Sequence, residues 1–86
     1  PYFENACLDL SDIKALPNAL KELTMRYPNV SALICNAGRG MFKHLEEFSY
    51  DQIRSLIDLN LLSHIYITKA FLPALKKQKR SDLIFI

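Results

Sequence analysis

The 86-residue sequence contains few of the residues that mark several classes of small protein. Two cysteines, Cys7 and Cys35, are too few for a disulfide framework and lack the spacing of a zinc site, so we predict reduced thiols and no metal. Eleven basic residues against nine acidic ones leave a net charge of only +2, which argues against a nucleic-acid-binding protein. No apolar run approaches the roughly 18 residues of a membrane span, and no signal peptide is visible. We therefore expect a cytoplasmic protein that binds neither nucleic acid nor a membrane.

Half of the residues are hydrophobic and 23% are charged, which is typical of a packed globular chain. At this length the chain can form one small domain at most. Its first residue is not methionine, and Leu83 to Ile86 is an apolar run with no turn signal behind it. We therefore predict an internal segment of a longer protein. The alternative is a complete small protein that finishes in a strand.

The spacing of apolar residues predicts alternating strands and helices. Asn5 to Leu10 is a short apolar stretch that we predict to be a strand. Apolar residues at spacings of three and four predict a helix from about Leu16 to Tyr27, with Pro17 in its first turn. Val30 to Cys35 is almost uniformly apolar, which is typical of a parallel-sheet strand covered on both faces.

The second predicted helix has a clear start signal. Ser49 and Gln52 form an S-x-x-Q capping box, and the helix is expected to run from Tyr50 to about Lys77. Its apolar residues extend around most of its circumference, which indicates deep burial or contact with a second subunit. With Leu83 to Ile86 as a last strand, the order is β-α-β-α-β, the signature of an α/β fold with a parallel sheet.

Three sites in the chain carry polar residues that could bind a ligand. Asp9 follows the first predicted strand, where a simple turn carboxylate is the alternative. Asn36 to Gly38 follow a buried strand, and ligands of open α/β sheets bind outside the carboxyl ends of strands. Asn60 lies in the apolar stripe of the long helix, where a buried amide needs a hydrogen-bond partner. The alternative to a functional partner is a hydrogen bond within the helix or to a bound water.

Two further residues are interpreted as parts of the core. His64, one turn after Asn60, is expected to be a core or interface histidine rather than a catalyst. Cys35 is expected to be a small buried hydrophobe.

Three motifs together resemble those of the short-chain dehydrogenase/reductase family. Leu8-Asp9-Leu10-Ser11-Asp12 is similar to the adenine-contact segment after the family's third strand, Ile34-Cys35-Asn36-Ala37-Gly38 to its N-N-A-G motif after the fourth, and Leu59-Asn60-Leu61 to the helix asparagine of its Asn-Ser-Tyr-Lys tetrad. The last strand resembles the family's fifth strand. Cys35 stands where the N-N-A-G motif has its first asparagine, whose family role is largely structural.

The resemblance implies part of a doubly wound, parallel-sheet Rossmann fold, with residues 1–86 as the central segment of a single NAD(P)-binding domain that is incomplete at both ends. It implies an oxidoreductase that transfers a hydride between NAD or NADP and a carbonyl or alcohol substrate. Asp9 and Leu10 would contact the adenine, Asn36 to Gly38 would line the cofactor's ribose, and Asn60 would anchor a proton-relay water.

Two further expectations concern the substrate and the oligomeric state. Arg39 to Phe42 would border the substrate, and the helix from Tyr50 to Lys77 would join copies of the protein into a homo-oligomer. The chain contains no G-x-x-x-G-x-G turn, no Y-x-x-x-K pair and no serine beyond its last strand. The resemblance places these motifs outside the 86 residues, so we expect the segment alone to be inactive.

Two other classes of protein remain open. One is a non-catalytic α/β interaction module that associates through its long apolar helix. The other is a flavodoxin-like or receiver-like domain, which would need a phosphate loop or an acidic cluster. The substrate and the choice between NAD and NADP are not encoded in this segment.

Overall fold

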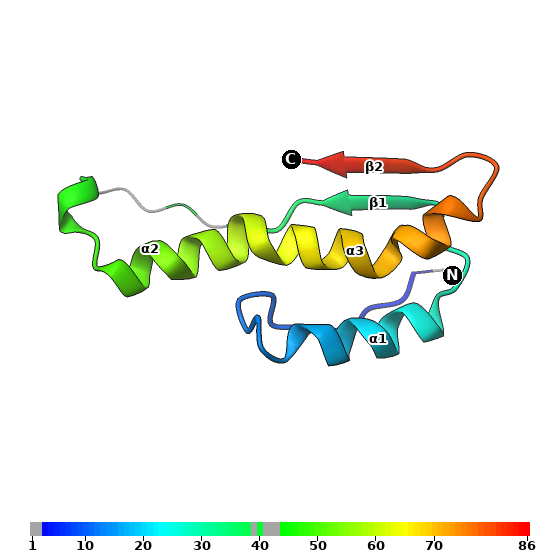
Figure 1. Ribbon diagram of the computed structural model, residues 1–86, viewed down its shortest axis with the longest axis horizontal. Helices are drawn as coiled ribbons and strands as arrows, with labels where there is room; N and C mark the ends of the chain where they lie inside the picture. The colour runs from blue at the N-terminus through cyan, green and yellow to red at the C-terminus, as the bar shows by residue number, and fades with distance from the viewer. Residues whose placement is uncertain (1–2, 39, 41–43) are drawn as a thin grey trace.

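The computed structural model describes residues 3–38, 40 and 44–86. Its elements, in chain order, are helix α1 (Leu16–Arg26), strand β1 (Ala32–Cys35), 3-10 helix η1 (Leu45–Glu47), helix α2 (Tyr50–Ile57), π-helix η2 (Asp58–Leu62), helix α3 (Ser63–Lys76) and strand β2 (Asp82–Phe85). Figure 1 shows that α2, η2 and α3 follow one another along one long helical rod. The alternation of helices with parallel strands confirms the predicted α/β class.

Helix α1 begins and ends where its sequence predicts. Pro17 lies in the first turn, where a missing N–H leaves no helical hydrogen bond unmade. A looser turn precedes it, in which the Leu16 N–H donates to the Asp12 carbonyl at 3.1 Å. Tyr27 ends the helix and donates its N–H to the Leu23 carbonyl at 3.0 Å.

The long helix starts with the predicted capping box. The Gln52 N–H donates to Ser49 Oγ at 3.1 Å, and the Ser49 N–H donates to Gln52 Oε1 at 2.9 Å. The helical rod ends at Lys76 with Lys77 as its cap, as expected. The π-helix η2 was not predicted. Such single-turn bulges accommodate an extra residue in a helix and often mark functional sites.

Strands β1 and β2 are parallel neighbours, as expected of the fourth and fifth strands in the Rossmann strand order 3-2-1-4-5-6. Ala32 lies opposite Asp82 and Cys35 lies opposite Phe85. Strand β1 begins two residues later than expected, and Val30 packs against the core that the helices share.

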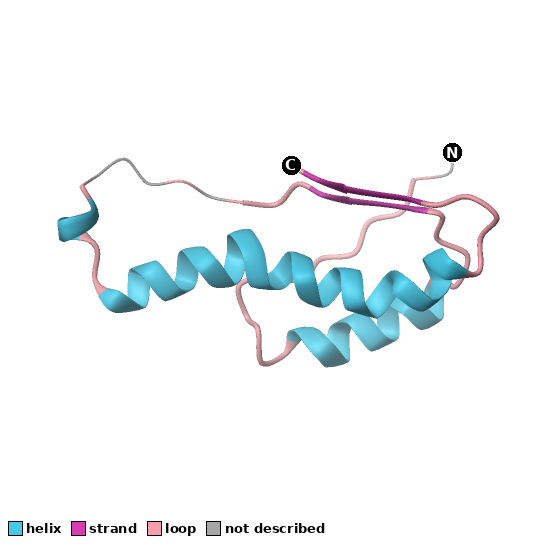
Figure 2. Ribbon diagram, turned by 45° about the horizontal axis from the view of Figure 1, so that its top comes forward, coloured by secondary structure: helices cyan, strands magenta, loops and turns pink. Residues whose placement is uncertain are grey.

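Helices α1 and α3 lie on the same face of the two-stranded sheet, as Figure 2 shows. Their core consists of Leu16 and Leu20 of α1 and Phe71 of α3. On the other face, Ile34 and Ile84 are exposed. The prediction that β1 is covered on both faces is therefore wrong for this chain, since the described residues provide only one helical layer.

The strand predicted at Asn5 to Leu10 is not formed. Residues 3–9 have no regular secondary structure, and Leu10 begins a turn. In the part of the chain that the structure describes, the sheet consists of β1 and β2 alone. A strand needs a neighbour for its N–H and carbonyl groups. In the doubly wound order this segment is not a neighbour of β1, so its pairing partner is missing here.

Candidate functional site

The predicted site residues lie toward the carboxyl ends of the two strands. Asn36 to Gly38 follow β1 directly, and the turn with Asp9 lies just before α1, on the side of the molecule to which both strands point (Figures 1 and 2). This edge is where ligands of open α/β sheets bind. Of the stretch from Arg39 to Phe42, expected to border the substrate, only Gly40 belongs to the described residues.

Asp9 is oriented by Ser11. Its Oδ1 accepts a hydrogen bond from Ser11 Oγ at 2.6 Å and another from the Ser11 N–H at 3.0 Å. These bonds, the hydroxyl first, hold the pKa of the Asp9 carboxyl below its ordinary value because they stabilise the ionised form. Neither bond uses Oδ2, which leaves that atom available to a donor. Asp9 is thus a turn carboxylate, as the alternative interpretation expected, with one oxygen still open.

Leu10 anchors this turn. It is half-buried and packs against the core that α1 and α3 share. Next to it, the Asp12 N–H donates to the Asp9 carbonyl at 3.2 Å, which closes the turn. The position of the Asp9 carboxylate is therefore fixed relative to the helices rather than left to a free chain end.

Gly38 and Asn60 are brought together from distant parts of the sequence. A Cβ atom added to Gly38 would lie 3.1 Å from Asn60 Oδ1, closer than ordinary van der Waals contact. The missing side chain of Gly38 lets the loop approach the helix at this point. The structure therefore places the Asn36 to Gly38 segment against Asn60, although nothing in their spacing requires it.

Asn60 lies within η2 and is exposed. The prediction of a buried amide is wrong in this chain, because the neighbour of Asn60 is the Gly38 loop and not a packed layer. The π-helix is continued into α3 by Ser63, whose fully buried hydroxyl donates to the Leu59 carbonyl at 2.7 Å.

His64 is the residue near this site that the sequence analysis assigned only to the core. It is 5% exposed, which confirms the core interpretation. Its Nε2 lies 2.7 Å from the carbonyl oxygen of Ala37, and its ring stacks on Phe85 with centroids 6.2 Å apart. His64 therefore contacts the same loop that Asn60 contacts.

Cys35 is buried at the end of β1, as predicted. Burial raises the pKa of its thiol, an effect that a hydrogen bond with Thr68 only partly opposes. Both Cys7 and Cys35 are free thiols, and Cys7 is exposed. The two thiols should therefore differ in reactivity.

We expect a thiol reagent at neutral pH to label Cys7 promptly and Cys35 roughly 100-fold more slowly, because the buried thiol is both shielded and protonated. Absorbance at the released chromophore of the reagent, followed with and without denaturant, measures both rates. Cys7→Ser is the matched control, which should leave only the slow phase. Equal rates for the two thiols in native buffer would contradict the assigned burial of Cys35.

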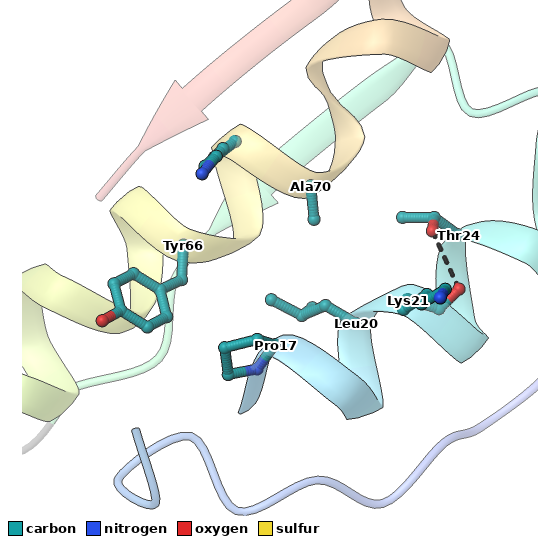
Figure 3. Close-up of a pocket in the computed structure, with 7 residues that line it drawn as sticks. Pro17, Leu20, Lys21, Thr24, Tyr66 and Ala70 are labelled. Carbon is teal, nitrogen blue, oxygen red and sulfur yellow. Dashed lines mark hydrogen bonds between the residues drawn. The ribbon is translucent and has the colours of Figure 1, made fainter. Parts of the chain in front are cut away.

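A separate groove of about 470 Å³ lies between α1 and α3 (Figure 3). It is lined by Pro17, Leu20, Lys21, Thr24, Tyr66, Lys69 and Ala70. Thr24 Oγ1 donates to the Lys21 carbonyl at 3.0 Å, so this hydroxyl already has a partner. None of the predicted site residues lines the groove. Ligands of open α/β sheets bind outside the carboxyl ends of the strands. We therefore assign the candidate site to the carboxyl ends of β1 and β2 and not to this groove.

The described residues contain neither a metal site nor a membrane-spanning helix. In these residues, no group of three or more histidine, cysteine, aspartate or glutamate side chains is arranged to hold a metal ion. Each helix among them is too short or too polar to cross a lipid bilayer.

Comparison with known proteins places the chain in a family. A sequence model described as short chain dehydrogenase matches residues 2–86. The 17-beta-hydroxysteroid dehydrogenase type 1 of Mus musculus is 35% identical over 71 residues, which are 83% of this chain and 20% of that protein. The human protein of the same name is 33% identical over 75 residues, 87% of this chain and 22% of the relative.

Solved structures agree with this assignment. An alcohol dehydrogenase from the archaeon Thermococcus sibiricus, complexed with 5-hydroxy-NADP, has a TM-score of 0.75 and 35% identity over 90% of this chain and 33% of its own. A metagenomic short-chain oxidoreductase in complex with NADP has a TM-score of 0.82 and 28% identity over 95% of this chain and 38% of its own. The predicted Rossmann α/β fold is confirmed. The chain spans about a fifth of the length of the mouse and human relatives. The chain belongs to the short-chain dehydrogenase family.

Proposed function

We propose that the protein containing this segment is an NAD(P)-dependent oxidoreductase that transfers a hydride between the nicotinamide and a carbonyl or alcohol carbon of a small molecule. The contact between Gly38 and Asn60 at the carboxyl end of β1 carries this proposal, because it joins a cofactor-type loop to the family's helix asparagine. Two related structures hold NADP or 5-hydroxy-NADP, which supports this choice of cofactor. Membership of a dehydrogenase family does not favour the interaction module.

The described residues fit such a cofactor. Asp9 Oδ2 is available to accept a hydrogen bond from the amino group of the adenine, beside Leu10. Asn36 to Gly38 would line the ribose, and the absence of a side chain at Gly38 lets this loop lie against Asn60. Asn60 would hold a water that passes protons between solvent and the acid/base group. When bound, the nicotinamide would donate or accept the hydride.

We further propose that residues 1–86 are the central segment of a single Rossmann domain in a larger cytoplasmic protein. The length of the relatives supports this, since this chain covers only 20% to 22% of each. The rod from Tyr50 to Lys77 would join two copies into a homo-oligomer. Exposed apolar side chains along the rod, Ile57, Leu61 and Ile65, support that role.

In the full-length protein, Asp9→Ala should raise the dissociation constant for the cofactor about 5- to 30-fold, the equivalent of about 1–2 kcal/mol for one hydrogen-bonding group. The fold should be unaffected, because Asp9 is exposed. Fluorescence titration with NADH and with NADPH measures the change and identifies the preferred cofactor.

Asp12→Asn is the matched control for Asp9→Ala. It removes a charge from the same turn and keeps the side-chain oxygen that accepts the Ala15 N–H at 3.3 Å. Its dissociation constant should stay close to that of the unmodified protein. An unchanged constant for Asp9→Ala would remove Asp9 from the site, whereas failure of the unmodified protein to bind either nucleotide would contradict the proposed function itself.

A further inference from the structure

We infer that His64 is a positioning residue, whose imidazole holds the backbone of the proposed cofactor loop in place. The inference rests on the proposed function, because it takes Asn36 to Gly38 as the loop that lines the ribose. The contact that carries it joins His64 Nε2 to the carbonyl oxygen of Ala37 at 2.7 Å. This distance is at the short end of the normal range for an N–H···O hydrogen bond.

The acceptor determines which atom donates in this hydrogen bond. A backbone carbonyl can only accept, so Nε2 carries the hydrogen and donates it to Ala37. The imidazole is 5% exposed, and a hydrogen bond in such a site meets little competition from water. Losing the donor would leave the loop carbonyl without this partner and the loop free to shift.

The ring itself is held by a second element. Phe85, at the end of β2, stacks on His64 with an angle of 17° between the ring planes. Phe85 lies opposite Cys35 in the sheet register, directly before the loop. His64 on α3 therefore links the loop after β1 to the end of β2.

The same stretch of helix touches the loop at two adjacent residues. Asn60 lies against Gly38, and His64, one turn later, bonds to Ala37. Asn60 sets how closely the loop can approach, while His64 supplies a directional bond that fixes its orientation. Through these two contacts, the helical rod supports the proposed cofactor loop in addition to carrying Asn60.

A residue that merely fills the core would tolerate any side chain of similar size. A positioning residue requires a donor at the place of Nε2. We therefore expect His64→Leu in the full-length protein to raise the dissociation constant and the KM for the cofactor roughly tenfold, the effect of one lost hydrogen bond. His64→Gln, whose amide N–H can reach the same carbonyl, should stay within about threefold of the unmodified protein. The KM for the second substrate should not change in either variant.

Leu75→Val is the matched control for a loss of stability alone. Leu75 is buried near the far end of α3, away from the loop. Its replacement should lower the melting temperature and leave the cofactor's dissociation constant unchanged. His64→Met provides a second variant without a donor if His64→Leu does not fold.

A second readout separates this inference from the proposed function. The backbone amide of Gly38 shares its peptide unit with the Ala37 carbonyl, so its nitrogen NMR shift, which responds to hydrogen bonding at that carbonyl more than to the nearby ring, reports the His64 bond without any cofactor. We expect this shift to move in His64→Leu and to be restored in His64→Gln. The inference is overturned if the Gly38 shift or the cofactor's KM responds equally to both variants, or to neither. If the Gly38 shift behaves as expected but no nucleotide binds, the proposed function fails and the assigned positioning of this loop for a cofactor fails with it.

Discussion

Replacing Asn60 with leucine is expected to lower the turnover of the full-length protein roughly 100-fold, within the range for loss of a proton-transfer group, while the cofactor still binds. The physical reason is the place of this amide in η2, beside Gly38 at the strand edge. A leucine there has the same number of heavy side-chain atoms, but it cannot form the hydrogen bond that would hold the relay water. Steady-state kinetics beside a melting curve measure both effects.

Asn18→Leu is a suitable control for Asn60→Leu. Asn18 is also an exposed helical asparagine, but it lies on α1 outside the candidate site. Its replacement should leave turnover within about twofold, as expected of a surface change. If Asn60→Leu shifts the melting temperature and leaves turnover unchanged, Asn60 has only a structural role.

Local signals predicted the helices well because their causes lie within a few residues. The capping box needs only the side chains and backbone N–H groups of Ser49 and Gln52, and it formed as expected. Pro17 restricts the start of α1 by its own ring. The pairing of β1 with β2 also followed, since two consecutive parallel strands joined by a helix are usually neighbours.

The errors have non-local causes. The segment from Asn5 to Leu10 has the composition of a strand, but a strand exists only beside a partner, and none of the described residues provides one. Asn60 was predicted to be buried because it lies in an apolar stripe of the helix, but the stripe does not show whether another element covers it. The π-helix η2 alters the helical phase at Asn60, which a regular period cannot predict.

The sequence predicted the segments of the candidate site but not the contacts between them. The sequence motifs indicated Asp9, Asn36 to Gly38 and Asn60 as separate segments. The contacts of Gly38 with Asn60, and of Ala37 with His64, depend on how the helix crosses the loop. His64 was assigned to the core correctly, but a residue's burial does not show whether its hydrogen-bond partner is functional.

The 86 residues alone are expected to lack dehydrogenase activity and to self-associate instead of forming a stable monomer. They contain no Y-x-x-x-K pair to act as acid and base. Their two-stranded sheet leaves Ile34 and Ile84 60% and 46% exposed, and two strands with an open face are marginal in water. The rod adds Ile57, Leu61 and Ile65, each at least half exposed at four-residue spacing. Covering these surfaces removes apolar area from water, which favours association.

Sedimentation velocity at micromolar concentration tests this expectation and can locate the interface. Ile57→Glu combined with Ile65→Glu places charge on the rod, whereas Ile34→Thr combined with Ile84→Thr makes the open sheet face more polar and keeps β-branched side chains. If the rod is the main interface, the first pair should shift the chain toward 9.9 kDa and the second should not. If the sheet face dominates, the order reverses. A single folded species near 9.9 kDa with a cooperative melt, observed for the unmodified chain, would contradict the expectation that the segment forms no stable monomer.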